Sequence, residues 1–311
     1  MREKAEQVRA LVLLSGGLDS ILAAKLLLEQ GVKVEGICFY SNFFDCRSAR
    51  KAARRLNIKL REVDISSELL EIIRAPKHGY GAGLNPCIDC HALMIKKAGE
   101  IMKAEGSCFV ATGEVLGERP MSQHKKALKI IEKEAKLEGY LLRPLSAKLL
   151  EPTTPEVRGL VIRDKLMDIS GRGRKKQMEL AKKFGITDYP TPAGGCMLTQ
   201  DGFVSRLKEL MEKKSDFNPE DVELSKIGRH FWDNSTQIIL GRDKEENEML
   251  VLAKTKKNAL VVPDNFAGPS ALVRGEQIGD KSIEKAKELV VQYSPKVKNN
   301  IDINLNFKIG K

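Results

Sequence analysis

Strand-length apolar runs alternate with helix-patterned segments along the first half of this chain, and that alternation limits the folds available to it. Runs such as ALVLLS, VKVEGICFY and SCFVATG are short and rich in aliphatic residues, as buried strands are. Segments with helical periodicity lie between them, for example LDSILAAKLLLEQ and residues 91–105. Alternation of this kind is typical of a parallel sheet covered by helices on both faces. The sequence therefore predicts a doubly wound α/β domain over roughly residues 1–185.

The rest of the chain predicts a second, smaller domain. A loop rich in proline and glycine, a helix near residues 201–214 and the polar stretch KKSDFNPED follow the first domain. We expect residues 186–218 to form a cysteine-bearing loop and a helical linker. Strand-like TQIILG, ALVVP and PSALVRG then alternate with two helical segments. This shorter alternation predicts a small C-terminal α/β domain over residues 219–311.

The first strand ends in the sequence SGGLDS, residues 15–20. A strand that turns through two glycines into a helix presents successive backbone N–H groups and the positive end of the helix dipole to one point. Phosphate oxygens bind well at such a point, and the hydroxyls of Ser15 and Ser20 add further donors. The carboxylate of Asp19 beside a phosphate is unfavourable unless a cation lies between them. The pattern predicts a site for a nucleotide and Mg²⁺.

SGGLDS matches the signature of the PP-loop ATP pyrophosphatases letter for letter, and the chain resembles that family. The resemblance implies an enzyme that cleaves ATP between its α and β phosphates and transfers AMP to a carbonyl oxygen. The residues it places on ATP are Ser15, Gly16, Gly17, Leu18, Asp19 and Ser20, with Mg²⁺ near Asp19. We expect the backbone around Phe39 and Tyr40, at the end of the second strand, to hold the adenine. No GxxxxGK[ST] motif occurs, which argues against a P-loop kinase or GTPase.

The chain has six cysteines, and its polar first ten residues lack the apolar core of a secretory signal. This context favours buried thiols, metal ligands or catalytic groups over a disulfide framework. Cys38 and Cys108 lie in strand-like runs, so we expect both to pack in the core. The sequence gives no assignment for Cys46.

Cys87 and Cys90 in NPCIDCH, together with Cys196 in PTPAGGC, form a second chemical pattern. Structural zinc takes four ligands, and His91 could serve as the fourth. Three cysteines with an open fourth position suit an iron–sulfur cluster. Without a metal, one thiolate could carry a persulfide that a second thiol resolves as a disulfide. The residues alone leave these three interpretations open.

A PP-loop followed by NPCxxC and a distant GGC is similar to the tRNA thiolation enzymes, which include 2-thiouridylases and iron–sulfur-dependent thiouridine synthetases. In the cluster-bearing members three cysteines bind a 4Fe-4S centre. The resemblance therefore assigns Cys87, Cys90 and Cys196 as catalytic residues and cluster ligands. Asp89 is a candidate general acid or base, or alternatively a loop cap. Arg143 in LLRPLS could neutralise phosphate charge or pair with a carboxylate at the end of the sheet.

Two further segments resemble known families. Residues 111–123, ATGEVLGERPMSQ, resemble the segment after the fourth sheet strand of 4-thiouridine synthetases. This resemblance implies that Thr112, Gly113 and Glu114 lie near the nucleotide, and it favours 4-thiouridine over 2-thiouridine as the product. Residues 228–273 resemble a small RNA-binding domain found beside ribosome-associated proteins.

The chain carries a formal net charge of +11, which favours a polyanionic partner. Residues 220–311 hold 15 basic and 14 acidic residues, so nearly all of the excess lies in residues 1–219. Two segments there, 47–61 and 171–183, are strongly basic. Beside a nucleotide motif they favour RNA binding over a merely solvated helix face. The candidate RNA-binding residues are Arg54, Arg55, Arg172, Arg174, Lys175 and Lys176.

Together these patterns predict an ATP-dependent tRNA sulfurtransferase with ATP, Mg²⁺ and a 4Fe-4S cluster as cofactors, zinc or a metal-free persulfide site being the alternatives. The expected partners are tRNA and a sulfur donor, which could be inorganic sulfide, a cysteine desulfurase or a sulfur carrier protein; a homodimer is left open. No apolar run reaches the roughly 20 residues of a bilayer span, so we expect a cytoplasmic protein without membrane association. Two other functions remain open. One is a sulfur insertase or amidating synthetase that acts on a small molecule, and the other is an RNA-binding module that keeps ATP as a structural ligand.

Overall fold

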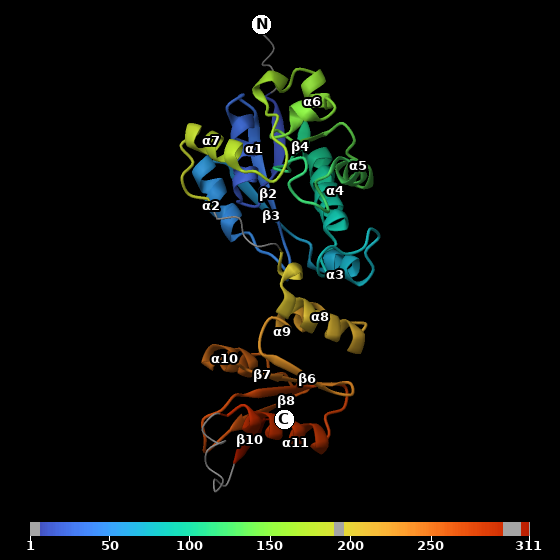
Figure 1. Ribbon diagram of the computed structural model, residues 1–311, viewed down its shortest axis with the longest axis vertical. Coiled ribbons are helices and arrows are strands. Elements are labelled where there is room, and N and C mark those ends of the chain that lie inside the picture. Colours follow the sequence, from blue (N-terminus) through green and yellow to red (C-terminus); the bar gives the residue numbers. More distant parts are fainter. Residues whose placement is uncertain (1–6, 190–195, 295–305, 311) are drawn as a thin grey trace. The chain divides into compact units, whose positions relative to one another are not determined.

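Figure 1 shows the computed structural model of the chain, which describes residues 7–189, 196–294 and 306–310. Contacts divide the chain into two compact units, Met1–Gln200 and Asp201–Lys311. The boundary falls inside residues 186–218, for which the sequence predicts a loop and a linker. The cysteine-bearing loop belongs to the first unit, and the helix after it belongs to the second.

The first unit is built on one parallel sheet, which confirms the predicted doubly wound α/β fold. Its strands are β1 (Arg9–Leu13), β2 (Lys33–Tyr40), β3 (Lys59–Asp64), β4 (Phe109–Ala111) and β5 (Leu141–Leu142). Their order in space is β3-β2-β1-β4-β5. The chain order changes direction between β1 and β4, and ligands bind at the carboxyl ends of strands at such a switch point. The SGGLDS loop directly follows β1, so it lies at this switch point.

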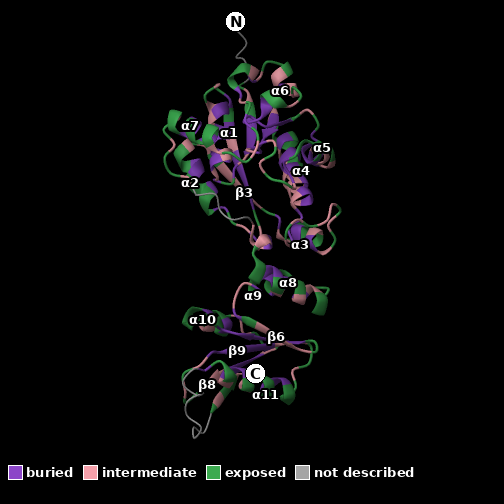
Figure 2. Cartoon of the chain, viewed as in Figure 1, coloured by how far each residue is buried: buried purple, intermediate pink, exposed green. Residues whose placement is uncertain are grey.

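Helices lie on both faces of this sheet (Figure 1). They are α1 (Leu18–Leu28), α2 (Arg47–Leu56), α3 (Ser66–Arg74), α4 (Cys87–Glu105), α5 (Lys125–Ala135), α6 (Thr154–Val157) and α7 (Lys175–Lys183). Side chains alternate along β1: Leu11 packs in a core with residues of α4 and α5, whereas Ala10 and Val12 pack in another core with residues of α1. Figure 2 shows the burial of the strands between the helices.

Two helices of the first unit differ from the sequence prediction. α4 begins at Cys87, four residues before the predicted start near residue 91. Cys87 and Cys90 therefore lie in the first turn of this helix, not in the loop before it. α3 was not predicted, because its nine residues are too few for a clear helical period beside the preceding strand.

The second unit has an antiparallel sheet with the order β10-β8-β9-β7-β6. Its strands are β6 (Arg229–Asp233), β7 (Thr236–Leu240), β8 (Asn258–Pro263), β9 (Ala271–Arg274) and β10 (Phe307–Gly310). Its helices are α8 (Asp201–Lys213), α9 (Pro219–Leu224), α10 (Lys244–Leu252) and α11 (Asp280–Gln292). The predicted mixture of strands and helices is confirmed. The strands pair antiparallel, however, whereas the predicted α/β class implies a parallel sheet. The unpredicted strand β6 pairs with β7 through a two-residue turn at Asn234, which has φ +53°, and such a turn makes neighbouring strands antiparallel.

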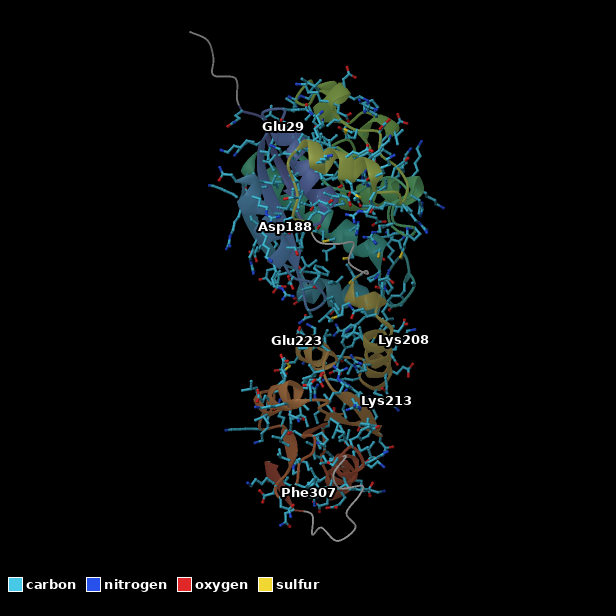
Figure 3. The ribbon with its side chains drawn as sticks, turned by 60° about the vertical axis from the view of Figure 1, so that its left-hand side comes forward. Glu29, Asp188, Lys208, Lys213, Glu223 and Phe307 are labelled. Carbon is cyan, nitrogen blue, oxygen red and sulfur yellow. A yellow bond between two sulfur atoms is a disulfide. The ribbon has the colours of Figure 1, made fainter. Side chains whose placement is uncertain are left out.

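Helices also cover this second sheet on both faces. Ala286 and Val290 of α11 pack with Ile238 in one core, and Leu250 of α10 packs in another. Phe307 of β10, labelled in Figure 3, meets Phe266 edge-on with the ring centroids 5.5 Å apart. None of the described helices combines the length and the apolar character needed to cross a membrane.

His230 in β6 gives the second unit a pH-dependent stability. Its Nε2 lies 2.8 Å from the Ile227 carbonyl oxygen and its Nδ1 lies 3.0 Å from Nε2 of Gln237, which suits a neutral ring that donates through Nε2 only. Burial lowers the pKa of His230 from 6.5 to about 4, with Arg206 and Arg274 adding to the effect. Since the unfolded chain holds this proton more tightly, we expect the unit to lose stability as pH falls from 6.5 towards about 4, by roughly 3 kcal/mol at most.

Hydrogen exchange of the β6 and β7 amides at neutral pH and near pH 5 measures this effect. Protection is expected to fall at the lower pH in the wild-type protein, and less so in His230→Gln, which cannot take up a proton. Equal loss of protection in both proteins would assign the effect to other groups.

Candidate nucleotide and cysteine sites

The loop between β1 and α1 is held in a single shape by its own contacts. Gly16 has φ +81°, a left-handed conformation, and a Cβ there would lie 2.2 Å from the carbonyl carbon of Ser48 in α2. The Ser20 hydroxyl donates to the Gly17 carbonyl oxygen at 2.8 Å, and its oxygen accepts from the Gly16 N–H at 3.2 Å. Ser15 Oγ lies 3.3 Å from Ser20 Oγ. These contacts hold the loop in one conformation, and the hydroxyls of Ser15 and Ser20 lie within it.

Gly16→Ala is expected to unfold or displace this loop and to abolish ATP binding. A left-handed residue with a Cβ costs about 1–2 kcal/mol by itself, and the clash with the Ser48 backbone adds to it. Gly31→Ala is the matched control, since Gly31 has a similar left-handed conformation, φ +77°, after the far end of α1, and a Cβ there would meet nothing within 4 Å. Thermal unfolding and ATP titration of both variants check this. Equal ATP affinity in Gly16→Ala would contradict the assigned role of the loop.

Asp19 lies in the first turn of α1, next to Leu18, whose side chain is buried in a core with residues of α7. Burial raises the pKa of Asp19, and Arg174, Gln177 and Arg119 act in the opposite direction. Its Oδ1 is buried and has no hydrogen-bond partner among the described residues. An unpartnered carboxylate oxygen in such surroundings suits a cation ligand, so Asp19 is the residue that would hold Mg²⁺.

Of the two residues predicted to hold adenine, Phe39 has the better placed backbone. The Leu14 N–H donates to the Ile37 carbonyl oxygen at 2.8 Å, just after β1 ends. The Tyr40 carbonyl oxygen accepts from the Ile65 N–H at 3.0 Å on the opposite side of β2. Because backbone groups alternate sides along a strand, those of Phe39 face the side where β1 has ended. The side chain of Phe39 is buried in the core, and that of Tyr40 is exposed.

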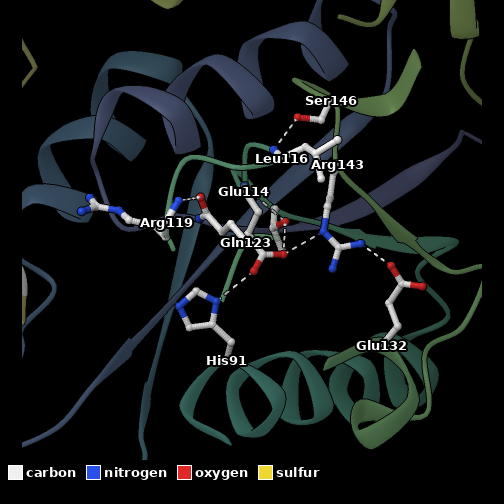
Figure 4. Close-up of polar contacts among 9 residues, drawn as sticks. His91, Glu114, Leu116, Arg119, Gln123, Glu132, Arg143 and Ser146 are labelled. Atoms are coloured by element: carbon white, nitrogen blue, oxygen red, sulfur yellow. Dashed lines mark hydrogen bonds and ion pairs between the residues drawn. The ribbon is translucent and has the colours of Figure 1, made fainter. Parts of the chain in front are cut away.

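Glu114, just after β4, is the centre of a buried polar network (Figure 4). Its carboxylate accepts from Thr112 Oγ1 at 3.1 Å and from Arg143 Nε at 2.9 Å, and lies 2.9 Å from Nδ1 of His91. Arg143 also contacts Glu132. Burial by itself raises the pKa of Glu114, but Arg143 and His91 outweigh it and lower the pKa to about 2. Arg143 therefore pairs with carboxylates, which is one of the two roles that the sequence left open.

Gly113 connects this network to the nucleotide loop. A Cβ at Gly113 would lie 2.5 Å from the Ser20 nitrogen and 2.6 Å from the Asp19 carbonyl carbon. The backbone at Gly113 thus packs directly on the first turn of α1. The side chains of Thr112 and Glu114 bind each other and the network, so these two residues support the loop and do not offer free polar groups to a nucleotide.

Cys87, Cys90 and Cys196 come together in the first unit. Cys87 and Cys90 lie about one turn apart at the start of α4, and Cys196 directly precedes the short 3-10 helix η3 (Met197–Thr199). The Leu84 N–H donates to the Leu198 carbonyl oxygen at 2.9 Å, which joins the two segments. Burial, with Cys196 and Cys87 nearby, raises the pKa of the Cys90 thiol. Burial raises the pKa of Cys196 as well, and Cys87 again contributes.

The chemistry of these three thiols fits a metal centre. Because the pKa values of Cys90 and Cys196 are raised, a bound cation would favour the thiolate forms of these two groups. The Asn85 side-chain amide donates to Cys87 Sγ at 3.2 Å. Within the described ranges no group of three or more His, Cys, Asp or Glu residues is arranged to hold a metal ion. The three thiols therefore lie near one another without forming a complete metal site, although thiols are the donors that iron–sulfur clusters and zinc use. Residues 190–195, next to Cys196, lie outside the described residues.

Asp89 and His91 have structural contacts beside these cysteines. The Asp89 carboxylate accepts from the His78 N–H at 3.0 Å, so it holds the loop before α4, one of the two roles considered for it. His91, the candidate fourth zinc ligand, is held by Glu114 through Nδ1.

Cys38 and Cys46 form a disulfide, which the sequence analysis did not predict. Cys38 lies in the core as expected, and the turn at Ser41, whose N–H donates to the Phe44 carbonyl oxygen at 2.9 Å, brings Cys46 back to it. Cys108 is half-buried and packs against the core on the α1 face, as predicted.

Five of the six candidate RNA-binding residues are exposed: Arg54, Arg55, Arg172, Lys175 and Lys176. Arg55 contacts Asp188, which Figure 3 labels, and Lys176 pairs with Asp168 at 2.9 Å. Arg174 differs from the others, because it is half-buried and acts on Asp19. Lysines of α5 that the sequence analysis did not single out line a shallow surface groove: Lys125, Lys126, Lys129 and Lys133.

Two family models match this chain. The model described as thiamine biosynthesis protein (ThiI) matches residues 5–148, and the model described as NFACT protein RNA binding domain matches residues 228–311. The first match spans the SGGLDS loop, Cys87, Cys90 and the segment 111–123. The second bears out the RNA-binding resemblance of residues 228–273.

Curated proteins similar to this chain include tRNA-modifying enzymes. A tRNA-specific 2-thiouridylase MnmA of Stutzerimonas stutzeri (strain A1501) is 27% identical over 249 residues, which cover 72% of this chain and 61% of that protein. The MnmA of Sulfurimonas denitrificans is 35% identical over 121 residues, 35% of each chain. This chain thus spans less than two thirds of the length of these relatives. Among solved structures, the U34-tRNA thiolase NcsA from Methanococcus maripaludis with its 4Fe-4S cluster aligns with a TM-score of 0.34 at 19% identity, over 70% of this chain and 69% of that one.

Proposed function

We propose that this chain, which joins a PP-loop domain of the ThiI family to an NFACT-type RNA-binding domain, is an ATP-dependent tRNA sulfurtransferase. One observation carries the proposal: a single folded unit holds both the preformed SGGLDS loop and three converging cysteines. The loop suits activation of a carbonyl group by ATP, and the cysteines suit delivery of sulfur. The RNA-binding domain supports a nucleic acid as the substrate over a small molecule.

In the proposed reaction, a uridine carbonyl oxygen attacks the α-phosphorus of ATP. The bond to the β-phosphate breaks, pyrophosphate leaves with the bonding electrons, and the uridine carries AMP on its oxygen. Sulfur then adds to the same carbon, and AMP leaves with the original oxygen. The backbone N–H groups in the first turn of α1 and the dipole of that helix stabilise the phosphate charge, and Asp19 would hold Mg²⁺ beside it.

Cys87, Cys90 and Cys196 are the residues that would hold a 4Fe-4S cluster, which supplies an open iron position for sulfide when it is bound. The closeness of the three thiols supports this assignment over isolated, independent cysteines. Zinc with His91 as a fourth ligand, and persulfide exchange between the thiols, are the alternatives. Iron and sulfide analysis of protein prepared without oxygen separates the three. A cluster predicts about four iron atoms per chain, zinc predicts about one metal ion, and persulfide chemistry predicts neither.

The similarities point to two different carbonyl atoms. The match of residues 5–148 to the ThiI family and the segment 111–123 support 4-thiouridine, the predicted product. The relatives named as 2-thiouridylases support 2-thiouridine. Incubation of the protein with ATP, Mg²⁺, sulfide and unmodified tRNA, followed by nucleoside analysis, tests the function and distinguishes the products. Either thiouridine supports a tRNA sulfurtransferase, and turnover of ATP with no thionucleoside contradicts it. The sulfur donor in the cell and a homodimer stay predictions.

Charge reversal at Lys175 and Lys176 is expected to weaken tRNA binding about tenfold and to reduce its dependence on salt, because each exposed lysine that contacts a phosphate releases a counterion. The matched control reverses Lys33 and Lys59, which are exposed at the amino ends of β2 and β3, opposite the edge with the nucleotide loop. Filter binding at several salt concentrations measures both pairs. Equal losses in the two double variants would indicate a general charge effect and no defined tRNA surface at α7.

A further inference from the structure

Polar side chains from outside the SGGLDS loop, those of Arg174 and Gln177, lie beside Asp19. Leu180 and Ala181 of α7 pack in one core with residues of α1, and this packing brings Gln177 next to Asp19. Gln177 is 0% exposed, its amide acts as a donor toward the Asp19 carboxylate, and its Oε1 has no hydrogen-bond partner within the described residues. Nε of Arg174 and Oδ1 of Asp19 are buried and unpartnered in the same described part of the chain. Because buried polar groups in native proteins are normally paired, these unpartnered groups around Asp19 indicate a ligand.

The charges near Asp19 indicate the chemistry of that ligand. Burial raises the pKa of Asp19, and the guanidinium groups of Arg174 and Arg119 oppose it. The backbone brings the two segments together: the Gly171 N–H donates to the Leu116 carbonyl oxygen at 2.7 Å, and the segment that leads to Arg119 packs on the first turn of α1 through Gly113. Burial, with Asp19 nearby, also raises the pKa of Glu118, and the same two arginines oppose it. Two cationic groups, two carboxylates and one buried amide thus lie near one another at the switch point of the sheet. Guanidinium and amide groups bind phosphate oxygens, and carboxylates bind the magnesium ion that accompanies them.

We propose that Arg174, Gln177 and Arg119 form the second wall of the nucleotide site and bind the β- and γ-phosphates of ATP opposite the SGGLDS loop. The inference rests on the proposed function and adds residues to it. It also reassigns Arg174 from the RNA surface to the nucleotide. RNA is the less suitable ligand here, since Arg174 and Gln177 act on Asp19, next to the nucleotide loop, whereas the other basic residues of this segment are exposed.

The reaction explains why these groups are cationic. When the uridine oxygen bonds to the α-phosphorus, the bond from that phosphorus to the bridging oxygen breaks, and its electron pair stays with pyrophosphate. Negative charge therefore grows on the leaving group. Arg174 and Arg119 stabilise that charge, and the Gln177 amide supplies a neutral donor that stays in place because it is enclosed by α1 and α7.

The test titrates the full chain with magnesium pyrophosphate and, separately, with AMP by calorimetry. Arg174→Ala is expected to weaken pyrophosphate binding about tenfold or more while AMP affinity stays within about threefold, since only pyrophosphate binds these groups. Gln177→Leu, which keeps the volume, is expected to weaken pyrophosphate binding about fivefold with a thermal midpoint equal to or above the wild-type value. Arg174→Lys should recover part of the loss. Arg158→Ala is the matched control, because it removes an exposed arginine of the same unit that has no role in either site and should change neither affinity.

Three results would overturn the inference. Unchanged pyrophosphate affinity in Arg174→Ala and Gln177→Leu shows that α7 does not contact the phosphates. Equal losses for pyrophosphate and AMP show a general disturbance of the loop. Loss of tRNA affinity alone in Arg174→Ala returns that residue to an RNA surface. In all three the wild-type protein still binds ATP, so the proposed function survives; a wild-type protein that binds no adenine nucleotide contradicts both.

Discussion

Replacing Cys196 with serine is expected to abolish thiolation, by at least about a thousandfold, while pyrophosphate release from ATP changes by less than about threefold. The two steps depend on different groups. Activation of the uridine needs the loop at residues 15–20, whereas sulfur delivery needs a third thiol beside Cys87 and Cys90. Serine keeps the size of the side chain and removes only the sulfur atom. The variant should therefore accumulate adenylated RNA that receives no sulfur.

Cys108→Ser is the matched control for this prediction. Cys108 is also a half-buried free thiol of the first unit, but it packs against the core on the α1 face. Thiolation by this variant should stay within about threefold of the wild-type rate. Single-turnover assays that follow AMP, pyrophosphate and thiouridine separate the two steps. If Cys196→Ser still thiolates tRNA, the three cysteines do not act as one site.

Asp19→Asn is expected to slow the release of AMP and pyrophosphate by about a hundredfold to a thousandfold. Asparagine has the same shape, but it lacks the charge that holds Mg²⁺ next to the phosphates. The folded protein should not suffer from this change. Because burial of the Asp19 carboxylate disfavours its ionised form, its replacement should leave the thermal midpoint equal or higher. Lost activity with retained or increased stability is the signature of a functional carboxylate.

Asp168→Asn serves as the control for Asp19. Asp168 is exposed and pairs with Lys176 at the surface, and it lies close in sequence to α7. Its replacement should change ATP turnover and the thermal midpoint little, since exposed ion pairs contribute at most about 1 kcal/mol. Equal effects of the two substitutions on turnover would remove the special role of Asp19.

The sequence predicts the first unit well because its signals are local. Strand-length runs and helical periods fix the parallel sheet, and SGGLDS fixes the place where β1 meets α1. The antiparallel sheet of the second unit was less predictable, since pairing direction depends on turns such as the one at Asn234 and on contacts far apart in the chain. The early start of α4 at Cys87 was missed for a related reason. A loop and a first helical turn share the same residues, and packing decides between them.

The candidate sites were predictable where their residues form one contiguous sequence motif, as in SGGLDS. The convergence of Cys196 on Cys87 and Cys90 could be expected only from resemblance, because more than a hundred residues separate them. Periodicity could not reveal the pairing of Cys38 with Cys46. Arg174 appeared in the sequence as one of several charges on a helix, and only the packing of α7 on α1 distinguishes it from Arg172. The one signal that pointed to Gln177 was a polar residue on the apolar side of that helix.

RNA-dependent pyrophosphate release from ATP is the most direct measurement of the central claim. We expect release to be slow with the protein, ATP and Mg²⁺ alone and to rise at least about tenfold when unmodified tRNA is added, because the uridine is the acceptor of AMP. Each pyrophosphate should be matched by one thiouridine when sulfide is present. Release that ignores tRNA, or that proceeds equally with a small-molecule acceptor, would contradict a tRNA sulfurtransferase.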